Sequence, residues 1–191
     1  MIGYGCGFTA HQHHMNIREI DWHRDWVRRV LRSLDTSLVR CCEDFEDVDD
    51  MLEHGNGIAG IAFVALQVYI RIAMDDLKRV FPGCPESDEL WRLETPLVGR
   101  TGVSHIEAIW EAANYFKHLE GWEAWPSRKG RRAKTRITNA LEKMGVSRDT
   151  EYRCIEVLRR LQGECWHLPT LLDTACEWRE AWFARLKRSE T

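Results

Sequence analysis

The fold of this chain is decided by one long apolar stretch, IAGIAFVALQVYIRIAMDDLKRV, which occupies residues 58–80. Within its first part, residues 58–70, the run is interrupted only by Gln67, and Arg71 follows directly. A helix that crosses a bilayer needs roughly 20 apolar residues, so this run is too short to span a membrane. The stretch therefore predicts a buried core helix, ended by the sequence Pro82-Gly83-Cys84-Pro85.

The segments on either side repeat apolar residues at three- and four-residue steps, which is the helical period. On the N-terminal side we expect a helix over 16–34 and a second one that begins at Asp35, Thr36 or Ser37, runs to about His54 and is broken by Gly55-Asn56-Gly57. On the C-terminal side we expect a short helix over 86–94, a helix from the capping box Ser104-His105-Ile106-Glu107 to about Leu119, a polar loop over 121–134, and helices over 135–144, from Ser147 to about Gln162, and from Pro169 onward.

No segment alternates polar and apolar residues in the way that a half-buried strand does. We therefore expect an all-α fold, a single-domain bundle of six to eight helices around one central apolar helix at about 58–80. The domain covers residues 1–191, and residues 1–15 are expected to be a flexible or loosely packed N-terminus.

Composition excludes several classes of protein. The 191 residues are 44% hydrophobic and 30% charged, unlike a disordered or collagen-like chain. A net charge of −3 excludes a polycation that coats nucleic acid. The seven cysteines contain no Cys-x-x-Cys pair and indicate reduced, intracellular thiols, and residues 1–15 lack the basic and apolar regions of a signal peptide. We therefore expect a cytoplasmic protein with no membrane segment.

No cofactor or metal is expected from the sequence motifs. The chain has no phosphate-binding loop, dinucleotide fingerprint or nucleophile elbow. His11, His13 and His14 lie near Cys6, but their spacing does not define a tetrahedral zinc site.

The helix that follows Ser104 carries the most suggestive set of polar residues. Glu107, Glu111, Asn114 and His118 follow one another at steps of four, three and four, so they share one helix face. In this position His118 could act as a general acid or base, with Asn114 one turn away to orient it. The alternative is an ordinary solvated helix face, with His118 favoured by the dipole at the helix C-terminus.

The segment Ala112-Ala113-Asn114-Tyr115-Phe116-Lys117-His118 resembles the N-x-x-K-H helix of HEPN-like all-α domains. Active members of that superfamily are metal-independent ribonucleases of toxin–antitoxin and phage-defence systems, with two copies meeting in a homodimer. Their hallmark is an Arg, often followed by Asn, with His four to six residues after the Arg. Asn114 and His118 match that Asn and His, whereas Ala113 occupies the place of the Arg. Arg100, which precedes the same helix, is the candidate substitute.

A basic run follows this helix, with six cations in nine residues: Arg128, Lys129, Arg131, Arg132, Lys134 and Arg136. Trp122 and Trp125 lie just upstream, and cations with stacking surfaces are what single-stranded nucleic acid binding requires. The alternatives are a solvated loop and a site for an acidic protein. The acidic run Glu43–Asp50 could pair with this basic run in a neighbouring subunit.

Two functions remain open at this point. The first is an RNA-binding or ribonuclease-like HEPN-type protein of a bacterial conflict system, active or degenerate, in which His118, Asn114 and Arg100 form the catalytic site and residues 128–136 clamp phosphates. The second is a non-catalytic helical adaptor or subunit that binds a protein partner. Twenty-one of the 27 basic residues are Arg and nine residues are Trp, and both types are enriched at interfaces.

Overall fold

The computed structural model describes residues 21–92, 95–118 and 132–189, and these form seven α-helices and no strand. The helices are α2 (Trp22–Asp44), α3 (Val48–Val80), α4 (Ser87–Arg92), α5 (His105–Lys117), α6 (Arg132–Lys143), α7 (Arg153–Gln162) and α8 (Leu168–Ser189). Leu97 and Ser104 form one isolated bridge in the turn before α5. The expected all-α bundle is confirmed.

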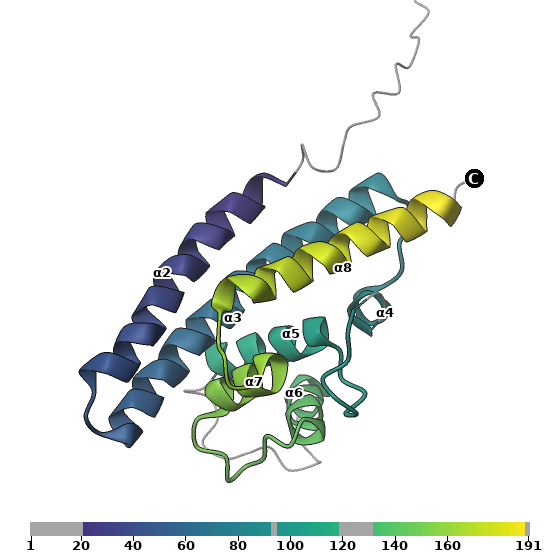
Figure 1. Cartoon of the computed structure of the whole chain (residues 1–191). Helices are drawn as coiled ribbons and strands as arrows, with labels where there is room; N and C mark the ends of the chain where they lie inside the picture. The colour runs from purple at the N-terminus through teal and green to yellow at the C-terminus, as the bar shows by residue number, and fades with distance from the viewer. Residues whose placement is uncertain (1–20, 93–94, 119–131, 190–191) are drawn as a thin grey trace, which may run out of the picture.

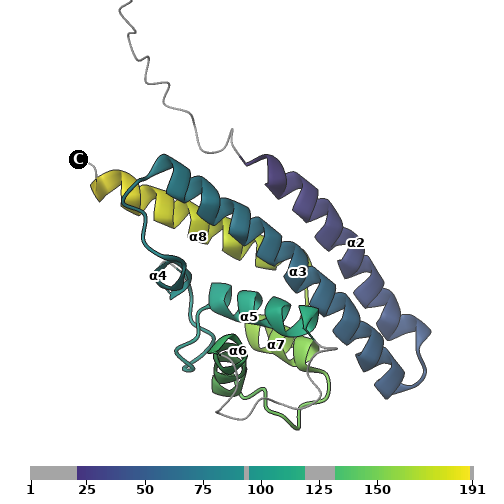
Figure 2. The same cartoon turned by 180° about the vertical axis from the view of Figure 1, so that it is seen from behind.

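Helix α3 is the centre of the fold, as its apolar sequence predicts. It packs against α2, α5, α7 and α8. The three long helices α2, α3 and α8 run side by side, and the shorter helices α4 to α7 lie together below them (Figures 1 and 2). Phe63, Leu66, Tyr69 and Ile70 of α3 are buried in the core, together with Trp178 and Trp182 of α8.

One described helix, α3, is long and apolar enough to cross a membrane by length and composition, but more than half of its most apolar window is buried within the fold. The core helix of a soluble protein can have the same length and apolar composition. The six cysteines in the described part of the chain are all free, and Cys41, Cys154 and Cys176 are buried. These features are compatible with a soluble protein.

The expected boundary between the first two helices is wrong. Asp35, Thr36 and Ser37 lie inside α2, and the chain turns at residues 45–47 instead. Asp47 is the N-cap of α3, and its side chain accepts hydrogen bonds from the backbone N–H groups of Asp49 and Asp50.

Asp35 does cap a helix, although not its own. Its Oδ1 accepts from the backbone N–H of Leu168 at 2.7 Å, and its Oδ2 lies 2.9 Å from the His167 ring. The expectation that Asp35 caps a helix is therefore correct, but the helix that it caps is α8.

The expected break at Gly55-Asn56-Gly57 is also wrong, because all three residues lie within α3. Asn56 caps α7, with its Oδ1 accepting from the N–H groups of Cys154 at 2.8 Å and Ile155 at 3.4 Å. A Cβ atom on Gly55 would lie 3.3 Å from a methyl carbon of Ile155, so this glycine lets α7 approach α3 closely. These typical helix breakers are present for packing between helices.

The remaining boundaries are closer to expectation. Helix α5 begins after Ser104, whose Oγ accepts from Glu107 N at 3.0 Å, as the capping box predicts. Helix α6 begins at Arg132, inside the expected loop, and ends before Gly145 with its φ of 79°. Helix α7 begins only at Arg153, since the cap comes from Asn56 while Ser147 forms a turn with Thr150. Pro169 lies in the first turn of α8.

Candidate functional site

The polar row on α5 is not a solvated face. Glu111 is fully buried, with an exposed fraction of 0%, whereas Asn114 is half-buried and His118 is exposed. Glu107, at the start of the row, is half-buried, so the row passes through the interior at Glu111 and is fully exposed only at His118, after the C-terminal end of the helix.

Glu111 and Asn114 belong to an internal network that links α3, α5 and α6. Glu111 Oε1 forms an ion pair with Arg136 Nε at 2.7 Å. The Asn114 amide donates to Glu111 Oε2 at 3.2 Å and accepts from Gln67 Nε2 at 2.9 Å. Gln67 also donates to the carbonyl oxygen of Trp110 at 3.1 Å. The carbonyl and the amino group of Asn114 are thus both engaged within the fold.

Aromatic rings surround the cationic end of this network. The Arg136 guanidinium carbon lies 4.8 Å from the centroid of the Trp91 ring, and the Trp91 and Trp110 rings are 4.7 Å apart. Burial raises the pKa of the Glu111 carboxyl above its ordinary value, and Arg136 and Asn114 partly oppose that shift. The network holds a charge pair at the junction of the three helices, where removal of one partner would be costly.

The three expected catalytic residues are not brought together. His118 follows the last residue of α5, and its backbone N–H donates to Tyr115 O at 3.2 Å. Arg100 is exposed in the turn before α5, so the length of this 13-residue helix, about 20 Å, separates the two. Asn114 contacts Gln67 and Glu111 rather than His118.

The basic run is only partly within the described residues. Arg128, Lys129 and Arg131 lie outside them, and Arg132 and Lys134 are placed in the first turn of α6. Arg136 is half-exposed and ion-paired with Glu111, so its guanidinium is not an uncommitted phosphate ligand. The N-terminal set of Cys6, His11, His13 and His14 also lies outside the described residues, and within them no cluster of His, Cys, Asp and Glu could hold a metal ion.

A second polar cluster, which the sequence does not predict, lies between the start of α2 and the middle of α8. Asp21 Oδ1 accepts from Arg24 N at 3.1 Å, and Asp21 Oδ2 accepts from Tyr69 at 2.7 Å and from Arg179 at 3.1 Å. The Tyr69 hydroxyl also lies 3.3 Å from Cys176 Sγ. Burial raises the pKa of Tyr69 and of Cys176, which keeps both groups neutral and the thiol unreactive.

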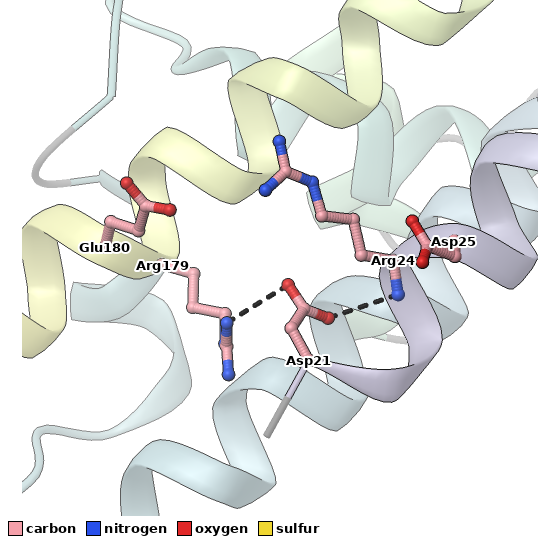
Figure 3. Close-up of a pocket in the computed structure, with 5 residues that line it drawn as sticks. All are labelled: Asp21, Arg24, Asp25, Arg179 and Glu180. Atoms are coloured by element: carbon pink, nitrogen blue, oxygen red, sulfur yellow. Dashed lines mark hydrogen bonds and ion pairs between the residues drawn. The ribbon is translucent and has the colours of Figure 1, made fainter. Parts of the chain in front are cut away.

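A cavity of about 400 Å³ opens beside this cluster (Figure 3). It is lined by Asp21, Arg24, Asp25, Arg179 and Glu180. Two arginines and three carboxylates line one small space, so the walls favour no single ligand charge. Of the residues that line the cavity, only Asp21 has a recognisable sequence pattern, that of a helix-capping residue before an amphipathic segment. Its pairing with Arg179 spans 158 positions and leaves no trace in local sequence.

No family model matches this chain, and comparisons with curated proteins and with solved structures find no match either.

Proposed function

We propose that this protein is a non-catalytic helical interaction protein that acts in the cytoplasm. The observation that carries the proposal is the network of Gln67, Asn114, Glu111 and Arg136. Asn114 and Glu111, the residues best placed to assist His118, bind other residues of the fold instead. A catalytic histidine is ordinarily oriented by a neighbouring group that hydrogen-bonds to its ring. In the described part of the chain, no hydrogen bond or ion pair joins His118 to Asn114 or Arg100.

Exposed apolar side chains support a role in binding. Trp26 of α2 and Ile61 of α3 are each 49% exposed, and Val68 of α3 is 42% exposed. Ile61 and Val68 lie two turns apart on one face of α3, and an apolar helix face that is exposed is typical of a contact with another macromolecule. The free cysteines agree with a reducing compartment.

The test is an RNA cleavage assay in EDTA, with the wild-type protein beside His118→Ala. His23→Ala is the matched control, because His23 is another exposed histidine. The proposal predicts no cleavage by any of the three proteins. Cleavage by the wild type and by His23→Ala that is lost in His118→Ala would contradict it and establish a metal-independent ribonuclease.

A second candidate function is binding of single-stranded RNA, in keeping with the HEPN resemblance of residues 112–118 and with a role in bacterial defence. The observation that favours it is the exposure of Lys117 and His118 at the end of α5, separated by nine residues (119–127) from the basic run in the sequence.

Fluorescence anisotropy with a labelled single-stranded RNA tests this candidate. The triple variant of Arg128, Lys129 and Arg131 to Glu should bind more weakly and reduce the salt slope by about 2, since each phosphate contact on a single strand contributes about 0.7. The control changes Arg32, Arg92 and Arg148 to Glu, which alters the net charge equally at exposed sites elsewhere. Equal weakening by both triple variants would reject a specific basic site.

A further inference from the structure

One face of α3 is apolar along its full middle section. Residues at three- and four-residue steps from 57 to 68 fall on this face, namely Gly57, Ile58, Ile61, Val64, Ala65 and Val68. None of them is buried, and Ile61 and Val68 are 49% and 42% exposed. We call these six residues the α3 stripe. A solvent-facing helix surface of this length ordinarily carries charged residues.

Only part of the stripe contributes to the core, since Ile58 and Val64 are half-buried and pack against it, whereas Ile61 and Val68 are exposed. The opposite faces of the same helix bury Ala59, Phe63, Leu66 and Ile70 against the rest of the fold. Figure 2 shows α3 with α2 along one side and α5 below it. The apolar character of the stripe therefore points to a contact outside the described chain.

The ends of the stripe are charged in a self-complementary way. Continuing the same helix face gives Asp50 and His54 before the stripe and Asp75 and Arg79 after it. Two copies of α3 can pack antiparallel about a point between Val64 and Ala65. In that register the numbers of two facing residues add up to 129. Asp50 then faces Arg79 of the other copy, and His54 faces Asp75.

The apolar residues match in the same register. Ile61 faces Val68 of the other copy, and Gly57 faces Ile72, which pairs the smallest side chain of the face with a large one. Asp75 and Arg79 make ion pairs with Arg71 and Asp76 of their own helix. Because exposed pairs of this kind contribute little, they can exchange for contacts across an interface.

We infer that a second copy of this chain covers the α3 stripe, with the two α3 helices antiparallel about a two-fold axis near Val64 and Ala65. The inference rests on the proposed interaction role. Such a two-fold contact is isologous, the commonest arrangement of a homodimer.

Helix α2 contributes to the same interface. Stable dimers bury about 800 Å² per partner, which is more than one helix stripe provides. Trp26 is half-exposed on the flank of α2 away from Arg28, and Arg28 forms an ion pair with Asp173 of α8 at 2.7 Å. Trp26 therefore lies on the side of α2 that continues the stripe, and α2 and α3 of both copies form a four-helix contact.

Sedimentation equilibrium of the full chain tests the interface. The wild type should be a dimer at micromolar concentration, and Ile61→Glu should raise the dimer dissociation constant at least about tenfold, since it places a charge in the apolar contact. Val39→Glu is the matched control, because Val39 is equally exposed on α2 but lies outside the stripe. Helical circular dichroism confirms that each variant is folded.

A charge exchange tests the register. Asp50→Arg and Arg79→Asp should each weaken self-association, because each variant faces like charges in a homodimer. An equimolar mixture should restore the dimer, since both facing pairs are then opposite in sign. The two positions lie about 44 Å apart along one α3, so no contact within a chain could produce this restoration.

A monomeric wild type, equal effects of Ile61→Glu and Val39→Glu, or no restoration in the mixture would each overturn the inference. Co-sedimentation of a monomeric wild type with liposomes, lost in Ile61→Glu, would assign the stripe to a lipid surface instead. The RNA cleavage assay has an independent readout, so failure of the non-catalytic proposal is distinguishable from failure of the dimer.

Discussion

At the scale of single residues, the most informative position is Glu111. A carboxyl that is fully buried on an amphipathic helix is unusual, and it is tolerated here because Arg136 pairs with it and Asn114 donates to it. The spacing of residues 107, 111, 114 and 118 predicts their common helix face. It cannot predict that α3 and α6 cover part of that face, since Gln67 and Arg136 are remote in sequence.

The pKa of Glu111 leads to a prediction about pH. Burial raises this pKa in the folded state above its unfolded value of about 4.3, so the folded protein holds the proton more tightly. The stability contributed by the protonated group is therefore present below pH 4.3 and is lost as the pH rises through the folded pKa. Urea unfolding from pH 4 to 8 should show this loss for the wild type relative to Glu111→Gln. Parallel pH profiles for the two proteins would contradict the assignment.

At the scale of elements, glycine has two different roles within α3. Gly57 has open space around its Cα, whereas a Cβ on Gly60 would overlap the ring of Phe116 of α5. The sequence predicts a helix break at Gly57 and a helix through Gly60, although α3 contains both, and it does not predict that, of the two, only Gly60 lies against another helix. Helical period and capping residues predict the existence of most helices, while the starts of α7 and α8 depend on Asn56 and Asp35, which are remote in sequence.

This difference predicts opposite effects of the same substitution. Gly57→Ala should raise the unfolding free energy by about 0.5–1 kcal/mol, because alanine is the better helix former. Gly60→Ala should lower it by about 1–3 kcal/mol, because Phe116 must move away from α3. Chemical denaturation of both variants checks the pair, and a stabilising Gly60→Ala would show that α5 does not pack this closely on α3.

At the scale of the whole molecule, α3 organises both the interior and the proposed contact surface. Its polar exceptions, Asn56 and Gln67, hold α7 and α5 in place, while its outer stripe remains available to a second copy. The acidic run Glu43–Asp50 joins α2 to α3, and the α3 stripe lies on the second of these two helices. This division of α3 between residues that hold other helices and an outer stripe is what the proposed interaction role requires.

The unfolding free energies of Asn114→Ala and His118→Ala test whether Asn114, in the middle of the polar row of α5, stabilises the fold. Asn114→Ala should lose about 1–3 kcal/mol, because Gln67 and Glu111 each lose a partner in a largely buried site. His118→Ala should stay within about 0.5 kcal/mol of the wild type, since His118 is exposed. Unchanged stability of Asn114→Ala would contradict this structural role and favour a role for Asn114 in orienting His118.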